Sequence, residues 1–474
     1  MLGHGTGDGR IVRAQPTLLL PLAGSELLER FAFFGMQGVL FLYLREQFSN
    51  GGGEGAWGLT ALKALLGQAS DSSGPHLASA LFGLVTGLIY LFTIVGGWLA
   101  DRRLGARAAI AWGGAINIVG YLLLTLPSTF LVGLILIALG TGGFKGNIAS
   151  TVGALYEPDD PRRERGFQLY LVAVNLGMFV APLVCGTLGE TQGWRWGFLA
   201  AAIGMAASLA LFLRAAGRLP PVATVAAGHS PAGAARAWTG RKILATACVL
   251  AALAIAFTGV QQIYNAYLGW ASTALDLTWH DRAIPTTWLL SLDTAFQVLM
   301  ISAIAWLWSL WARFAHEPGP LAKIALGLGL YAVAYACLVA ADADGSSAFF
   351  WVIAFHALNS LGFAVIAPVA LAFLTDRAPP RSRSTIVGLF YLQFAIGAFA
   401  AGALGAGSGL MSAEQLWTLH AAIMAVAGLL LFAGRRWIDA TLGGPLRPPA
   451  PPSTQDERTV LNAGHVSPSA GSPG

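Results

Sequence analysis

The chain has 474 residues, of which 55% are hydrophobic and only 11% are charged, and its mean hydropathy is +0.64. Soluble proteins carry about 25% charged residues, so this composition excludes an ordinary soluble protein and favours one that lies in a lipid bilayer. The sequence pI near 9.2 does not indicate nucleic-acid binding, because the basic residues do not gather into a patch suited to it. The three cysteines are far apart in apolar runs, which is typical of small core residues rather than of disulfides or a metal site.

A membrane-spanning helix needs about 20 mostly apolar residues, and about twelve such runs follow one another along the chain. In order they cover residues 17–44, 77–100, 106–125, 128–153, 165–188, 194–214, 243–268, 285–311, 320–340, 347–375, 384–408 and 413–434. Six runs lie on each side of residues 216–241, a stretch rich in Ala, Gly and Pro that is typical of a loose linker. We therefore expect an all-α membrane protein with six-helix bundles at residues 1–215 and 242–440 and a disordered tail at residues 441–474.

Lysine and arginine residues gather on one side of this expected membrane protein. They follow the second, fourth, sixth, tenth and twelfth runs, whereas the other side has only about four. Cytoplasmic loops carry such an excess of positive charge, so we expect both termini in the cytoplasm and the protein in the plasma membrane, the inner membrane of a bacterium. The linker offers only about 25 mostly polar or small residues, too few for a further pair of spanning helices.

The first apolar run carries Glu26, Glu29 and Arg30 in its middle. A charge at mid-bilayer costs about 2.5–3.5 kcal/mol on insertion scales, so three charges persist only if they pair or face a wet interior. Their spacing of i, i+3 and i+4 places them on one face of a helix, where Glu26 can reach Arg30. We interpret them as a candidate proton switch. The alternative is a structural ion pair that locks two helices together.

The fourth run holds Lys145, which we expect to meet Glu26 or Glu29 in one charged cluster between the first and fourth helices. The glycines around it favour helix packing over phosphate binding. No ATP-binding GxxxxGK[ST] pattern, metal-ligand pattern or nucleophile elbow occurs, so we expect neither an enzyme nor a cofactor. His356 is the clearest histidine inside an apolar run and has no spaced partner. A receptor that transports nothing is the remaining alternative class.

Four stretches of the sequence narrow the range of possible functions. They are Glu26-Leu-Leu-Glu29-Arg30-Phe31-Ala-Phe33-Phe34-Gly35, Gly96-Gly97-Trp98-Leu99-Ala100-Asp101-Arg102, Gly140-Thr141-Gly142-Gly143-Phe144-Lys145-Gly146-Asn147, and Asn175-Leu176-Gly177 followed by Ala181-Pro182-Leu183. Their order and spacing resemble the proton-dependent oligopeptide transporter family, most strongly in the first half. The resemblance implies the major facilitator superfamily fold, in which two six-helix bundles bind substrate between them near the midplane and rock around it.

The resemblance also implies roles for individual residues. Glu26, Glu29, Arg30 and Lys145 match the network that couples proton uptake to alternating access. Tyr90 and Asn175 match residues that contact the bound peptide, although both could equally be ordinary interhelical hydrogen-bonding residues. Apart from the resemblance, Asp101 and Arg102 with Arg107 are more typical of a gating and topology element of the cytoplasmic loop than of a binding site.

The expected substrate site departs from the family pattern at several positions. Phe33 and Phe34 stand where the family often has two tyrosines, Gln37 replaces an arginine, Gln261 and Phe363 replace acidic residues, Asp293 replaces an asparagine, and Phe257 adds apolar surface. The site has thus lost two carboxylates and a guanidinium and gained the carboxylate of Asp293. We expect Asp293 to hold the substrate's amine, unless it caps a broken helix or pairs with an arginine.

The predicted function is secondary active transport, as proton-coupled symport of di- or tripeptides or peptide-like compounds by alternating access. The alternative is a proton-linked carrier or exporter of a non-peptide metabolite, because the substrate site is so altered. The expected partners are a small peptide-like substrate, protons and the lipid bilayer, and we expect a monomer.

Overall fold

The computed structural model describes residues 15–50, 55–65, 74–157, 160–219, 239–344, 348–377, 383–407 and 410–443. The elements of the first half are α1 (Leu19–Ser49), α2 (Leu59–Leu65), α3 (Gly74–Leu99), η1 (Ala100–Leu104), α4 (Ala106–Leu123), α5 (Phe130–Gly153), α6 (Arg162–Ala181), η2 (Pro182–Gly186), α7 (Thr187–Gln192) and α8 (Trp194–Ala216). Those of the second half are α9 (Gly240–Gln262), α10 (Ala266–Ala274), β1 (Thr278–Trp279), β2 (Arg282–Ala283), α11 (Trp288–Trp311), α12 (Pro320–Asp344), α13 (Ala348–Arg377), α14 (Arg383–Ala406) and α15 (Ala413–Leu442).

Twelve helical segments within the described residues are long and apolar enough to cross a membrane. Three of them join consecutive elements into one segment: α3 with η1, α6 with η2 and α7, and α9 with α10. The expected all-α membrane protein with about twelve spans is therefore confirmed. The expected linker and tail fall mainly on residues 220–238 and 444–474, which lie outside the described residues.

The first helix runs further than its apolar sequence predicts. It ends at Ser49 rather than at residue 44, because polar side chains in its last turns have partners. Arg45 donates to the carbonyl of Gly269 at 3.1 Å, and Glu46 accepts a hydrogen bond from the indole of Trp194 at 2.7 Å. Hydropathy alone cannot indicate this extension, since the partners come from distant helices.

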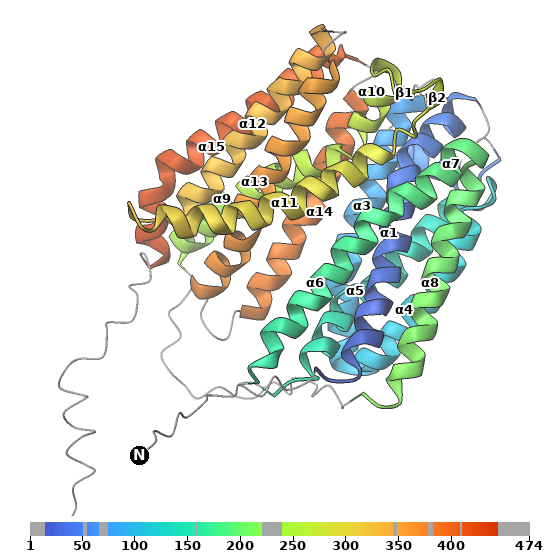
Figure 1. The fold of residues 1–474 in the computed structure, drawn as a ribbon, viewed down its shortest axis with the longest axis horizontal. Coiled ribbons are helices and arrows are strands. Elements are labelled where there is room, and N and C mark those ends of the chain that lie inside the picture. Colours follow the sequence, from blue (N-terminus) through green and yellow to red (C-terminus); the bar gives the residue numbers. More distant parts are fainter. Residues whose placement is uncertain are drawn as a thin grey trace, which may run out of the picture.

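The helices form two bundles that lie side by side (Figure 1). In the first, α1 packs against α6 and α8, and α4 packs against α5 and α8. In the second, α12 packs against α13 and α15. The bundles approach each other where α7, α10, β1 and β2 lie, and their ribbons diverge towards the opposite end (Figure 1). We call the first of these the joined end and the second the separated end.

Hydrogen bonds tie the two halves together at the joined end. Ser79 donates to Oδ1 of Asn265 at 2.8 Å. The carboxylate of Glu190 accepts from the backbone N–H groups of Thr286 and Thr287 at 2.8 and 2.9 Å, directly before α11. In the part of the chain that the structure describes, every hydrogen bond found between the halves lies towards this end. The joined end is therefore the contact that holds this conformation.

Glycine allows a close approach of the two halves at α3 and α14. At Gly83 of α3, a Cβ atom would lie 2.7 Å from the carbonyl oxygen of Ala398 on α14 and equally close to the backbone nitrogen of Gly402. Any side chain larger than hydrogen would push the helices apart, as expected where small residues line a helix contact in a membrane.

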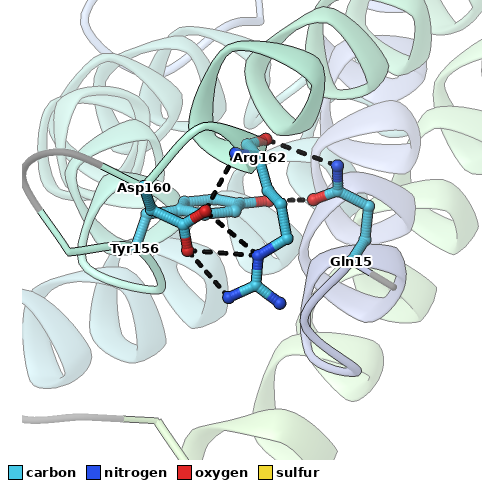
Figure 2. Close-up of polar contacts among 4 residues, drawn as sticks. All are labelled: Gln15, Tyr156, Asp160 and Arg162. Carbon is cyan, nitrogen blue, oxygen red and sulfur yellow. Dashed lines mark hydrogen bonds and ion pairs between the residues drawn. The ribbon is translucent and has the colours of Figure 1, made fainter. Parts of the chain in front are cut away.

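At the separated end, a cluster of polar side chains holds the residues that precede α1 (Figure 2). The hydroxyl of Tyr156 donates to Oε1 of Gln15 at 2.8 Å, and Nε2 of Gln15 donates to the carbonyl of Arg162 at 3.3 Å. The guanidinium of Arg162 pairs with Asp160 at 2.7 Å. Desolvation raises the pKa of the Tyr156 hydroxyl further above neutral pH. The residues before α1 are thus tied to the connection between α5 and α6.

Candidate functional site

Three charged side chains of α1 lie buried in the first bundle. Nε of Arg30 is 2.9 Å from Oε1 of Glu26 and 2.6 Å from Oε2 of Glu29. Glu29 is fully buried, and the other two keep no more than 5% of their surface exposed. The helical spacing that predicted a pair between Glu26 and Arg30 therefore produces one, and the same guanidinium also pairs with the second carboxylate.

Some polar atoms of these ion-paired side chains make no hydrogen bond. Within the described residues, Oε1 of Glu29 and Nη2 of Arg30 are buried without a hydrogen-bond partner. The hydroxyl of Tyr170 on α6 lies beside Glu26, a neighbour that sequence reasoning missed because a lone tyrosine in an apolar run gives no signal. Unpaired buried polar atoms are costly, so this cluster is suited to accept a proton or a further charged group.

Lys145 on α5 approaches this cluster but does not join it directly. In the part of the chain that the structure describes, neither carboxylate lies within ion-pair distance of its Nζ, although both are close enough to interact electrostatically. Nζ instead lies 4.5 Å from the ring centre of Tyr90 and 5.4 Å from that of Phe33. Aromatic faces attract a cation at such distances. In this conformation Lys145 therefore lies near the charged cluster without a direct ion pair to either glutamate.

Aromatic rings from both halves meet next to Lys145. The ring of Tyr90 lies 5.3 Å from those of Phe257 and Phe394, and Phe34 lies 6.0 Å from Tyr264. The sequence identified Phe34, Tyr90 and Phe257 but missed Tyr264 and Phe394. The spacing of Phe390 and Phe394 on one face of α14 could have indicated the latter.

The remaining residues expected at the substrate site differ in burial and in hydrogen bonding. Asn175 donates to the carbonyl of Leu171 in its own helix at 2.8 Å, as expected of an ordinary helical side chain. Gln37 is buried at 3% exposure. Gln261 is equally buried, and its Nε2 has no hydrogen-bond partner among the described residues. Phe363 is partly buried and packs against the hydrophobic core.

Asp293 on α11 has a partner that the sequence did not reveal. Its Oδ1 lies 3.0 Å from Nδ1 of His356 on α13, and Nε2 of that histidine lies 2.8 Å from the hydroxyl of Tyr267 on α10. Neither alternative considered for Asp293, a helix cap or an arginine pair, describes this contact. His356, which has no partner at a motif spacing, thus has one in space that is 63 positions away and that no sequence spacing indicates.

Asp101 and Arg102 lie elsewhere. Both are exposed in the π-helical turn η1 at the separated end. The guanidinium of Arg102 lies 5.3 Å from the ring centre of Trp98, in its own segment. The structure therefore brings neither residue to the charged cluster.

The sequence is similar to that of known proteins along most of its length. The sequence profile of the POT family matches residues 107–219 and 224–407. A peptide transporter of Yersinia enterocolitica is 28% identical over 485 residues, covering 87% of this chain and 91% of that protein. A di-/tripeptide transporter of Lactococcus lactis subsp. cremoris is 28% identical, covering 80% of this chain and 86% of its own.

Solved structures agree in fold. A peptide transporter POT in complex with sulfate superposes with a TM-score of 0.76 at 23% identity, covering 92% of this chain and 97% of that one. A POT family transporter in complex with 5-aminolevulinic acid superposes with a TM-score of 0.74 at 19% identity, covering 90% and 97%. The profile match includes Lys145, Gln261, Asp293 and Phe363 and spans well over half of the sequence. The chain therefore belongs to the POT family and is a multi-pass membrane transporter rather than an enzyme.

Proposed function

We propose that the protein is a proton-coupled symporter of di- or tripeptides or peptide-like compounds, working as a monomer by alternating access. The observation that carries the proposal is the buried ion-paired cluster of Glu26, Glu29 and Arg30, with Lys145 within electrostatic reach of it and next to aromatic rings from both halves. The names of the relatives, a peptide transporter and a di-/tripeptide transporter, favour a peptide over a non-peptide metabolite.

The charges of the first half suggest how a proton and a substrate bind together. Two carboxylates and two cations sum to zero when all four are ionised. A proton on Glu26 or Glu29 would leave one positive charge in excess, and burial makes such a charge costly. The carboxylate of a peptide near Lys145, which is only partly buried, would balance it. Proton and substrate would then each favour the binding of the other.

The orientation follows from the basic residues. Those after α3, α5 and α8 lie at the separated end, which we assign to the cytoplasm of a bacterium because cytoplasmic loops are rich in Lys and Arg. Both termini are then cytoplasmic, and the conformation joined at the opposite end faces inward. Asp101 and Arg102 lie exposed at this cytoplasmic end, where we expect them to help close it.

The substrate would lie against Phe34, Tyr90 and Phe257. Gln37, Asn175, Gln261 and Phe363 would contribute to its selection, with Phe33 behind Lys145. Compared with the family pattern this site is poor in charge, so aromatic contacts would supply more of the binding energy.

Uptake by proteoliposomes tests the proposal. A labelled dipeptide panel should accumulate only when a pH gradient, acidic outside, is imposed. Lys145→Ala should abolish this accumulation and leave counterflow exchange, because exchange requires no net proton movement. Lys63→Ala, in the short helix α2 away from the charged cluster, is the matched control. Gradient-driven accumulation by Lys145→Ala would contradict the coupling role.

A further inference from the structure

One buried aromatic ring of α1 is in contact with two cations of the first half. The ring centre of Phe33 lies 5.8 Å from Cζ of Arg30 and 5.4 Å from Nζ of Lys145. Phe33 is only 1% exposed, so its side chain offers a substrate almost no surface. The sequence predicted it as a substrate contact, and this burial directs attention to its contacts with the cations instead.

The two cations differ in what holds them. Arg30 forms ion pairs of 2.9 and 2.6 Å with Glu26 and Glu29, which fix its guanidinium without help from the ring. Lys145 forms no ion pair in the described part of the chain, and its Nζ lies over the faces of Phe33 and Tyr90. An aromatic face attracts a cation most strongly where water is excluded. The position of Lys145 therefore depends on the rings far more than that of Arg30 does.

A second position for Lys145 is close by. Oε1 of Glu29 is buried without a hydrogen-bond partner among the described residues, and Glu29 is near enough to act on Lys145 electrostatically. Glu26 also attracts the ammonium group, whereas Arg30 repels it. These opposing charges offset each other in part, so the attraction of the ring faces is large enough to decide between the two positions.

The choice of position matters for the substrate. If Lys145 formed an ion pair with Glu29, a carboxylate of the protein would already occupy its ammonium group. The carboxylate of a substrate would then have to compete for it. Held over the aromatic faces, the ammonium group keeps its charge available.

We propose that Phe33 is a positioning residue, whose ring face holds the ammonium group of Lys145 away from the glutamates and free for the carboxylate of the substrate. The inference rests on the proposed peptide transport. It gives Phe33 a role that needs no contact with the substrate and no hydroxyl group. The loss of the tyrosine hydroxyl of the family pattern at this position is compatible with that role.

Stepwise fluorination of the Phe33 ring tests this role, because each fluorine weakens the attraction of the ring face for a cation and changes its shape little. Purified transporter with a mono-, di- or trifluorinated ring at this position is titrated calorimetrically with a dipeptide and with its C-terminal amide, which lacks the carboxylate. We expect the affinity for the dipeptide to fall with each fluorine, by about two- to thirtyfold in total. The affinity for the amide should stay the same.

The same series at Phe198 is the matched control. Phe198 is a fully buried phenylalanine on α8 of the same half, its ring packs edge-on against Tyr43 at 5.1 Å, and no cation lies over it among the described residues. Fluorination there should change neither affinity.

Three results would overturn the role of Phe33: an affinity for the dipeptide that is independent of fluorination, an equal loss for the amide, or an equal loss in the Phe198 series. If the unmodified protein binds neither ligand, the proposed peptide transport fails and this inference fails with it. Binding of the dipeptide with no effect of fluorination at Phe33 would overturn the inference alone, so the two failures are distinguishable.

Discussion

Replacing Gly83 by alanine should push the two halves apart at the joined end. The added Cβ would lie 2.7 Å from the carbonyl oxygen of Ala398, whereas ordinary contacts begin at 3.4 Å. The Cα atom of Gly402 would lie closer still, so the helices α3 and α14 must separate by more than about 0.7 Å. Overpacking of this kind costs about 1–3 kcal/mol. It destabilises only the conformation in which α3 and α14 are in contact, as they are here. The population of that conformation should fall about 5- to 150-fold relative to one separated at this end.

Cysteine labelling measures the shift. Ser79 is fully buried at the joined end, so Ser79→Cys should react with an impermeant maleimide only when this end opens. The naturally exposed Cys248 is first replaced by serine in every variant. Gly83→Ala should then raise the labelling rate by the factor given above and lower substrate accumulation.

Gly97→Ala is the control, since it changes the same helix at a position where a Cβ would meet no heavy atom within 4 Å. Equal labelling rates for the two alanine variants would refute the argument that close glycine packing stabilises the joined conformation.

Three further predictions concern the charges and the topology. Arg30→Met leaves two buried carboxylates without their cation, so it should lower thermal stability by about 3–5 kcal/mol, and an unchanged melting temperature would show that Arg30 contributes no net stabilisation. Asp293→Asn should weaken binding of a free-amine dipeptide about tenfold to a hundredfold, because a charge-assisted hydrogen bond contributes about 1.5–3 kcal/mol, while an equal loss for the N-acetylated form would argue against amine recognition. A cysteine at position 228 in the linker should react only from the cytoplasmic side, and labelling from outside would overturn the assigned orientation.

The sequence predicts those parts of the fold that depend on one segment at a time. Each span follows from the length of an apolar run, because a helix must cover the bilayer whatever its neighbours are. The pair between Glu26 and Arg30 follows from helical spacing in the same way. The end of α1 at Ser49 does not, since its last turns are held by Gly269 and Trp194 from other helices.

Contacts between helices could not be predicted, because they depend on how each helix is rotated about its axis. Lys145 shows this clearly. Its charge favoured a carboxylate partner, but the rotation of α5 directs Nζ to the faces of Tyr90 and Phe33. The contact between Asp293 and His356 joins two different helices, so no periodicity within one segment indicates it. Family resemblance identified Asp293 as unusual but could not supply its partner.

The position of Glu190 makes the opening of the outer end depend on the first backbone groups of α11. Its carboxylate satisfies free N–H groups at the start of α11 and places a negative charge at the positive end of that helix's dipole. Because Glu190 belongs to the first half and α11 to the second, separating the halves at this end would leave the N–H groups of Thr286 and Thr287 without their acceptor. Water or another acceptor would have to replace the carboxylate as the outer end opens, so this contact adds to the free-energy barrier that opening must cross.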